Sequence, residues 1–131
     1  MWTGVDAADQ MQKWHQGNKS GVKGMCLKTC RQAWKLRAKY PSAISAWTNT
    51  PKKYKSTNKL IIPVGAPVFW KGGRFGHVAI QSHKPGYVWT TDLPIKNRIG
   101  LVAIDFVELK WGYKFLGWTT RLNGKDINVK R

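Results

Sequence analysis

Two residues that together can perform nucleophilic catalysis stand where local structure could support them. Cys26 follows Gly24 and Met25 and opens a run with helical spacing, and His77 opens a short apolar strand over 76–80. A nucleophilic thiol and a histidine base are the two parts that a thiol hydrolase needs. The sequence therefore predicts Cys26 as nucleophile and His77 as base, although spacing alone does not show that they meet.

The predicted position of Cys26 bears on its reactivity. A thiol attacks as its thiolate, and a free cysteine has a pKa of about 8.5. The positive end of a helix and a nearby imidazolium both lower that pKa. We therefore expect Cys26 to react with iodoacetamide well below pH 8, with the helix N–H groups available to hold an oxyanion. Cys30, one turn deeper, is expected to be a buried structural thiol. A disulfide between the two along one helical turn is geometrically poor.

A third group should orient the histidine. Asp92 follows the strand after that of His77, and a turn over 84–86 joins the two strands. In an antiparallel hairpin Asp92 would return to a position near-opposite His77. We predict Asp92 as the orienting residue; the alternative is that it caps the turn at Leu93-Pro94.

No cofactor is expected. A zinc site can be drawn from Cys26, Cys30, His77 and His83, but these spacings resemble no compact zinc knuckle.

The pattern along the chain predicts an α+β fold in one domain over 1–131, with helices packed on an antiparallel sheet. Helices are predicted over 5–16, 26–40 and 42–47, with a helical turn over 105–111. Strands are predicted over 64–70, 75–82, 87–91, 98–104 and 113–120, and a surface loop over 48–59. The buried stripes are expected to hold Val5, Met11 and Trp14 in the first helix and Leu27, Cys30 and Trp34 in the second.

The charge indicates anionic partners. The chain has 23 Lys and Arg against six Asp and Glu, a net charge of +17. A field of that sign attracts nucleic acid, acidic lipid or the anionic polymers of a bacterial wall. No apolar run approaches about 18 residues, so no membrane span is expected. The N-terminus has neither a basic region nor an apolar core, so no signal peptide is expected.

Several motifs resemble those of the CHAP and NlpC/P60 peptidoglycan hydrolases. They are Gly-Met-Cys-Leu over 24–27, Gly-Ala-Pro-Val-Phe-Trp over 65–70 and Gly-His-Val-Ala-Ile over 76–80. The resemblance implies a papain-like fold, with Cys26 as nucleophile, His77 as base and Asp92 as the third polar residue. It implies cleavage of an amide bond in peptidoglycan. The chain departs from the family in having Met25 where many members have Asp, and in lacking an obvious glutamine as oxyanion donor.

The expected protein is thus a monomeric lytic enzyme of phage type, made in the cytoplasm and acting on the wall after release or as part of a virion. Its partners would be peptidoglycan and anionic wall polymers. Trp70, Trp89 and Phe75 either line its groove or belong to the core. The rival interpretation is a non-catalytic basic module that binds nucleic acid or a wall polymer. No nucleic-acid motif accompanies the basic run over 52–55.

Overall fold

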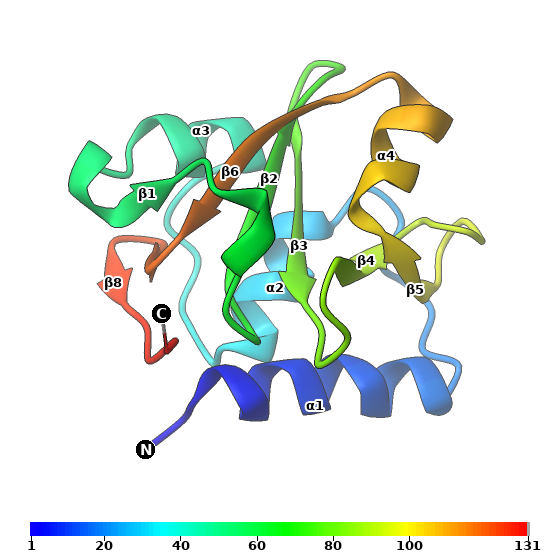
Figure 1. The fold of residues 1–131 in the computed structure, drawn as a ribbon. Coiled ribbons are helices and arrows are strands. Elements are labelled where there is room, and N and C mark those ends of the chain that lie inside the picture. The colour runs from blue at the N-terminus through cyan, green and yellow to red at the C-terminus, as the bar shows by residue number, and fades with distance from the viewer. Residues whose placement is uncertain (131) are drawn as a thin grey trace.

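The computed structural model, which describes residues 1–130, is an α+β fold built on a six-stranded antiparallel sheet (Figure 1). The strands lie in the order β1-β6-β2-β3-β4-β5. Their bounds are β1 Lys55–Ser56, β2 Pro67–Lys71, β3 His77–Gln81, β4 Tyr87–Thr91, β5 Ile99–Ala103 and β6 Lys114–Thr119. The predicted α+β class, its antiparallel sheet and five of these strands are therefore confirmed, whereas β1 lies in a segment predicted as loop.

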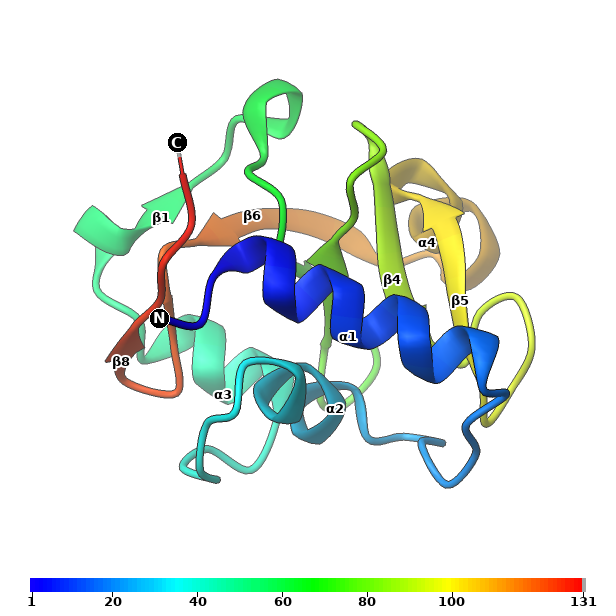
Figure 2. The same cartoon turned by 90° about the horizontal axis from the view of Figure 1, so that it is seen from below.

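Both faces of the sheet are covered, because its central strands are apolar on both sides. In β3, Val78 and Ile80 pack on one face and Ala79 on the other. The first face meets helices α1 (Gly4–Gln16), α2 (Cys26–Ala33) and α3 (Ala43–Thr48); the second meets α4 (Ile104–Trp111). Figure 2 shows α1 and α2 lying across the strands, with α4 on the far side. Continuous apolar runs of this kind are typical of strands buried on both faces.

The first helix begins with a capping box. The Thr3 hydroxyl accepts a hydrogen bond from the Asp6 N–H, and the Asp6 carboxylate accepts one from the Thr3 N–H. Such reciprocal bonds satisfy N–H groups that a helix start leaves without partners. The inner face of α1 is made of Gly4, Ala7, Ala8 and Met11. Val5 is 47% exposed, so its expected place on the buried stripe is wrong.

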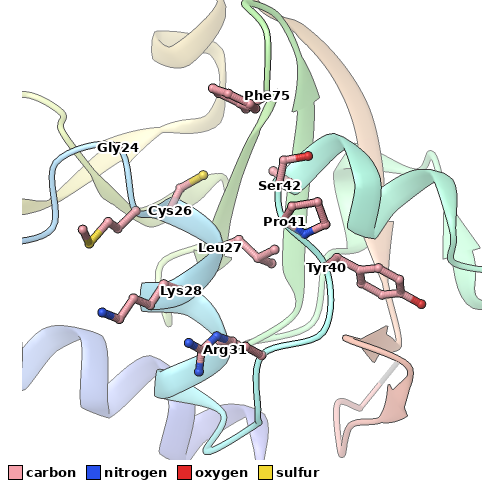
Figure 3. A pocket seen from close by; sticks show the side chains of 12 residues that line it. Gly24, Cys26, Leu27, Lys28, Arg31, Tyr40, Pro41, Ser42 and Phe75 are labelled. Carbon is pink, nitrogen blue, oxygen red and sulfur yellow. The ribbon is translucent and has the colours of Figure 1, made fainter.

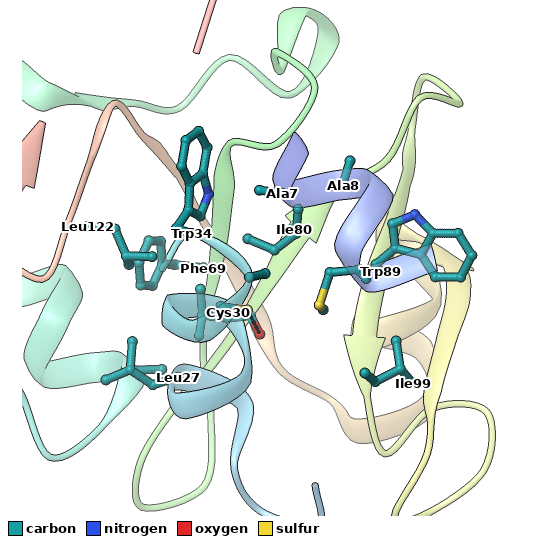
Figure 4. Packing of buried hydrophobic residues seen from close by; sticks show 14 of the residues in the cluster. Ala7, Ala8, Leu27, Cys30, Trp34, Phe69, Ile80, Trp89, Ile99 and Leu122 are labelled. Atoms are coloured by element: carbon teal, nitrogen blue, oxygen red, sulfur yellow. Dashed lines mark hydrogen bonds between the residues drawn. The ribbon is translucent and has the colours of Figure 1, made fainter. Parts of the chain in front are cut away.

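The second helix is shorter than predicted, ending at Ala33 rather than near Tyr40. Lys35 adopts a left-handed conformation with φ 58°, and the Leu36 N–H reaches back to the Arg31 carbonyl. This is the hydrogen-bond pattern that closes many helices, usually on a glycine. A lysine in that position gives no sequence signal. The buried face of α2 is as expected, with Leu27, Cys30 and Trp34 in the core (Figure 4).

The remaining elements are short. Short 3-10 turns, η1 (Lys52–Tyr54) and η2 (Lys59–Ile61), flank β1, and a two-stranded hairpin joins β7 (Arg121–Leu122) to β8 (Lys125–Asp126). Thr3 forms a parallel bridge with Asn128, so the segments around these two residues lie side by side. Within residues 1–130, every helix is too short or too polar to cross a membrane.

Candidate active site

A cleft with two arms runs past the first turn of α2. The helix arm, of about 300 Å³, lies between α2 and residues 38–43 (Figure 3). The histidine arm, of about 330 Å³, reaches His77, Asp92 and Trp111. Cys26 and Phe75 line both arms. The structure therefore places Cys26 where the arms meet, and it brings Cys26, His77 and Asp92 into one cleft.

Cys26 is the first residue of α2, in a setting rich in N–H donors. No side chain caps this helix, since the Met25 side chain makes no capping hydrogen bond. The backbone N–H groups of Val78, Leu27 and Cys26 itself lie close enough to the thiol to favour its ionised form. Figure 3 shows the Cys26 sulfur pointing along the cleft towards Phe75 and Ser42. The thiol thus lies near the backbone N–H of Val78, the residue that follows His77 in β3, and it shares the histidine arm with His77.

Burial nevertheless raises the pKa of the Cys26 thiol above its ordinary value. The negative charge of Asp92 raises this pKa further, whereas the backbone N–H of Val78 lowers it more than any other group does. Burial disfavours the charged form of any acid, and here it outweighs the helix start. The expectation of a lowered thiol pKa is therefore wrong for the free protein. Cys30 is more deeply buried, and burial raises its pKa further.

Alkylation should report this resting state. The labelling of Cys26 by iodoacetamide should keep accelerating from pH 7 to above pH 9, because only the thiolate reacts quickly. The measurement is the labelling rate at each pH, followed by mass spectrometry of intact protein. Cys26→Ser provides the background from buried Cys30. A rate that levels off below pH 8 would contradict the raised pKa.

His77 opens β3 and is held by aromatic neighbours. Its ring lies 4.9 Å from the Trp111 ring, edge-on at 86°, and 5.7 Å from the Trp70 ring, measured between centroids. Gly76 has φ +69°, and a Cβ there would lie 3.0 Å from the Trp70 carbonyl oxygen. Glycine tolerates the positive φ and has no Cβ to meet the Trp70 carbonyl, so it lets the chain turn tightly into β3. The His77 side chain is consequently buried, with 4% exposed.

A threonine, not Asp92, makes the hydrogen bond to His77. The distance from His77 Nε2 to Thr90 Oγ1 is 2.6 Å. Thr90 donates its own hydroxyl proton to the Thr91 carbonyl at 3.2 Å, so towards His77 the hydroxyl accepts. This pattern assigns the proton of neutral His77 to Nε2 and leaves Nδ1 as the basic nitrogen. Sequence reasoning missed Thr90, which lies diagonally across the hairpin from His77.

Asp92 braces the loop that precedes Cys26. One carboxylate oxygen accepts the Gly24 N–H at 2.9 Å, and the other accepts the Asn97 N–H at 2.8 Å. Asn97 Oδ1 in turn accepts the N–H groups of residues 21–23 at 2.8–3.3 Å. Asp92 and Asn97 both have positive φ, a conformation that these residue types tolerate better than most. Asp92 therefore holds the cysteine loop, and its charge also opposes the lowering of the His77 pKa.

Of the three aromatic residues considered for the groove, only Phe75 lines it. Phe75 is 58% exposed and belongs to both arms. Trp70 is fully buried and packs on His77, and Trp89 is 6% exposed and packs on His15. For Trp70 and Trp89 the core interpretation is correct. The aromatic wall of the histidine arm is instead made by Trp111 and Tyr113, from α4 and the segment after it.

The role of Thr90 can be tested with an internal control. Thr90→Val removes the acceptor and leaves a buried N–H without a partner, at a cost of about 1–3 kcal/mol in stability. We expect kcat to fall at least about tenfold, since the ring loses the bond that fixes its tautomer. The control variant Thr91→Val should keep the free energy of unfolding and the kcat of the natural protein, because the buried Thr91 hydroxyl has no hydrogen-bond partner among the described residues. Equal behaviour of the two variants on a soluble wall fragment would exclude this role.

No metal site adjoins the cleft in the part of the chain that is described. Within residues 1–130, no group of three or more His, Cys, Asp and Glu side chains is arranged to hold a metal ion. His83, considered above as a ligand, instead lies 2.8 Å from a carboxylate oxygen of Asp9 on α1.

No protein-family model, curated protein or solved structure matches this chain.

Proposed function

We propose that this protein is a cysteine hydrolase that cleaves an amide bond of bacterial peptidoglycan. The observation that carries the proposal is the joint placement of Cys26 and His77 in one cleft, with the thiol at a helix start and the imidazole oriented through Nε2. This is the arrangement of nucleophile, base and orienting group that thiol hydrolases use. It agrees with the resemblance of the motifs to CHAP and NlpC/P60 hydrolases and with the papain-like fold that they imply.

In the proposed mechanism charge develops only as the thiol attacks. Burial lowers the pKa of His77 to about 4 and raises that of Cys26, so both groups are neutral at rest. His77 Nδ1 takes the thiol proton as the sulfur attacks the carbonyl carbon of the amide. The N–H groups of Cys26 and Leu27, at the helix start, stabilise the oxyanion. His77 then protonates the leaving amine, and water hydrolyses the thioester.

The basic surface supports a wall polymer as substrate. Among residues 1–130, only Lys59 and Arg121 of the lysines and arginines lie within 4.0 Å of a carboxylate. The other lysines and arginines of the described chain are therefore available to bind an anionic partner. The walls of bacteria are anionic, so such a surface would concentrate the enzyme on its substrate.

Mass spectrometry of peptidoglycan incubated with the protein tests the proposal. We expect a new amine and a new carboxylate at one type of amide bond, and no such products with the Cys26→Ser protein. The identity of the products would separate an amidase from an endopeptidase. Binding to walls or DNA without any cleavage would instead favour the basic binding module.

A further inference from the structure

The charges that line the cleft indicate which peptides it takes. In the helix arm the charged side chains are Lys28 and Arg31. In the histidine arm they are Lys23, Arg74 and Lys96, together with Asp92, whose two oxygens already accept backbone N–H groups. None of the five cations lies within 4.0 Å of a carboxylate in the described part of the chain. Both arms therefore carry a net positive charge, because the helix arm has two cations and no carboxylate, and the single carboxylate of the histidine arm, Asp92, stands against three cations.

The position of Cys26 fixes how a substrate lies in the two arms. The scissile carbonyl must reach the sulfur where the arms meet. His77 must protonate the leaving amine, so the amine half of the substrate occupies the histidine arm. The acyl half is then left to the helix arm, beside Arg31 and Lys28. Each arm is about as large as the smallest ligand pockets, so only the residues next to the scissile bond lie within it.

We propose that the cleft selects an acidic peptide, with a free carboxylate on each side of the scissile amide. The acyl-side carboxylate meets Arg31, whose planar guanidinium suits a carboxylate and already donates to the Leu36 carbonyl at 3.2 Å. The amine-side carboxylate meets the cations of the histidine arm. This inference rests on the proposed function for its catalytic form, and it predicts that peptides amidated at these positions are poorer substrates.

Binding can be measured without turnover, using Cys26→Ser protein and two synthetic peptides. One peptide carries glutamate on each side of a central Ala-Ala amide, and the other carries glutamine. We expect the glutamate peptide to bind at least about tenfold more tightly by calorimetry, as charge-assisted hydrogen bonds allow. Replacing only the acyl-side glutamate should account for the part of this ratio that depends on Arg31.

The matched control separates a local contact from the general field of a protein with charge +17. Arg31→Gln and Lys52→Gln remove the same charge, but Lys52 is exposed on η1 and lines neither arm. Only Arg31→Gln should reduce the preference for the acyl-side glutamate. Equal affinity for the two peptides, or equal loss in the two variants, would overturn the inference.

The same peptides distinguish this inference from the proposed function. Cleavage of peptidoglycan without any preference for free carboxylates over amides would leave the hydrolase intact and overturn the acidic selectivity. A preference that depends on Arg31, in a protein that cleaves no wall bond, would sustain the acidic-peptide site and reject the hydrolase.

Discussion

Replacing Cys26 by serine should reduce wall hydrolysis by a factor on the order of 10⁴ or more, the scale on which loss of a nucleophile acts. Serine is nearly the same size but its hydroxyl is far less acidic, and this site already disfavours an ionised thiol through burial. Circular dichroism and the unfolding midpoint should stay close to those of the natural protein. Turbidity clearance of purified walls measures the loss.

Three further variants show whether a loss of activity in Cys26→Ser is specific to the proposed catalytic residues. Cys30→Ser should keep measurable activity, because Cys30 is a core thiol whose proton points to the Val78 carbonyl, 3.6 Å from the sulfur. His77→Ala should be as damaging as Cys26→Ser, since nucleophile and base act as a unit. Asp92→Ala should be damaging but less so, as it loosens the loop before Cys26. Full activity in Cys26→Ser would exclude the cysteine mechanism.

Acid should destabilise the fold through His77. Burial lowers the pKa of this histidine to about 4 in the folded protein, whereas an unfolded histidine has a pKa of about 6.5. Between these values the unfolded chain binds a proton that the folded protein excludes, so stability falls as the pH falls. The difference corresponds to about 3 kcal/mol lost between pH 6.5 and pH 4, with no further loss from this residue below.

Urea unfolding across this pH range, beside the variant His77→Gln, isolates the effect. The variant lacks the titration, so its free energy of unfolding should fall by about 3 kcal/mol less than that of the natural protein. Asp92 and Cys26 are the titratable neighbours that influence or share the site, and Lys23, Arg74 and Lys96 line the same cleft. All of them remain in both proteins. Parallel curves for the two proteins would show that His77 is not held neutral by burial.

The features that sequence reasoning predicted correctly are those set by local periodicity. The strands over 67–71 and 77–81 followed from short apolar runs bounded by glycine, and the burial of Cys30 followed from helical spacing after Cys26. The early end of α2 was missed, because the left-handed residue there is Lys35 and not a glycine. The C-terminal end of α2 is instead fixed by tertiary contacts, which include the hydrogen bond from the Trp34 indole N–H to the Gly65 carbonyl.

At the site, residue types were predictable but partners were not. The register, with Ile80 opposite Trp89, would put His77 opposite Asp92 if it continued, as the sequence suggested. The imidazole instead bonds Thr90, two residues earlier on the same face of the strand. The sequence also could not show that the pKa of the Cys26 thiol is raised and not lowered. Burial causes the rise, and it depends on how segments distant in the sequence pack around the thiol.

The bonds that hold the loop before Cys26 come from residues 68 to 76 positions further along the chain. A ribosome releases residues in order, so Cys26 is synthesised long before Asp92 and Asn97 exist to fix its loop. His77 and Thr90 likewise emerge after the thiol, and a nascent chain that stops short of Asn97 cannot assemble the cleft. The proposed nucleophile therefore reaches its folded setting only late in synthesis, and a truncated product would carry Cys26 without the residues that hold its loop.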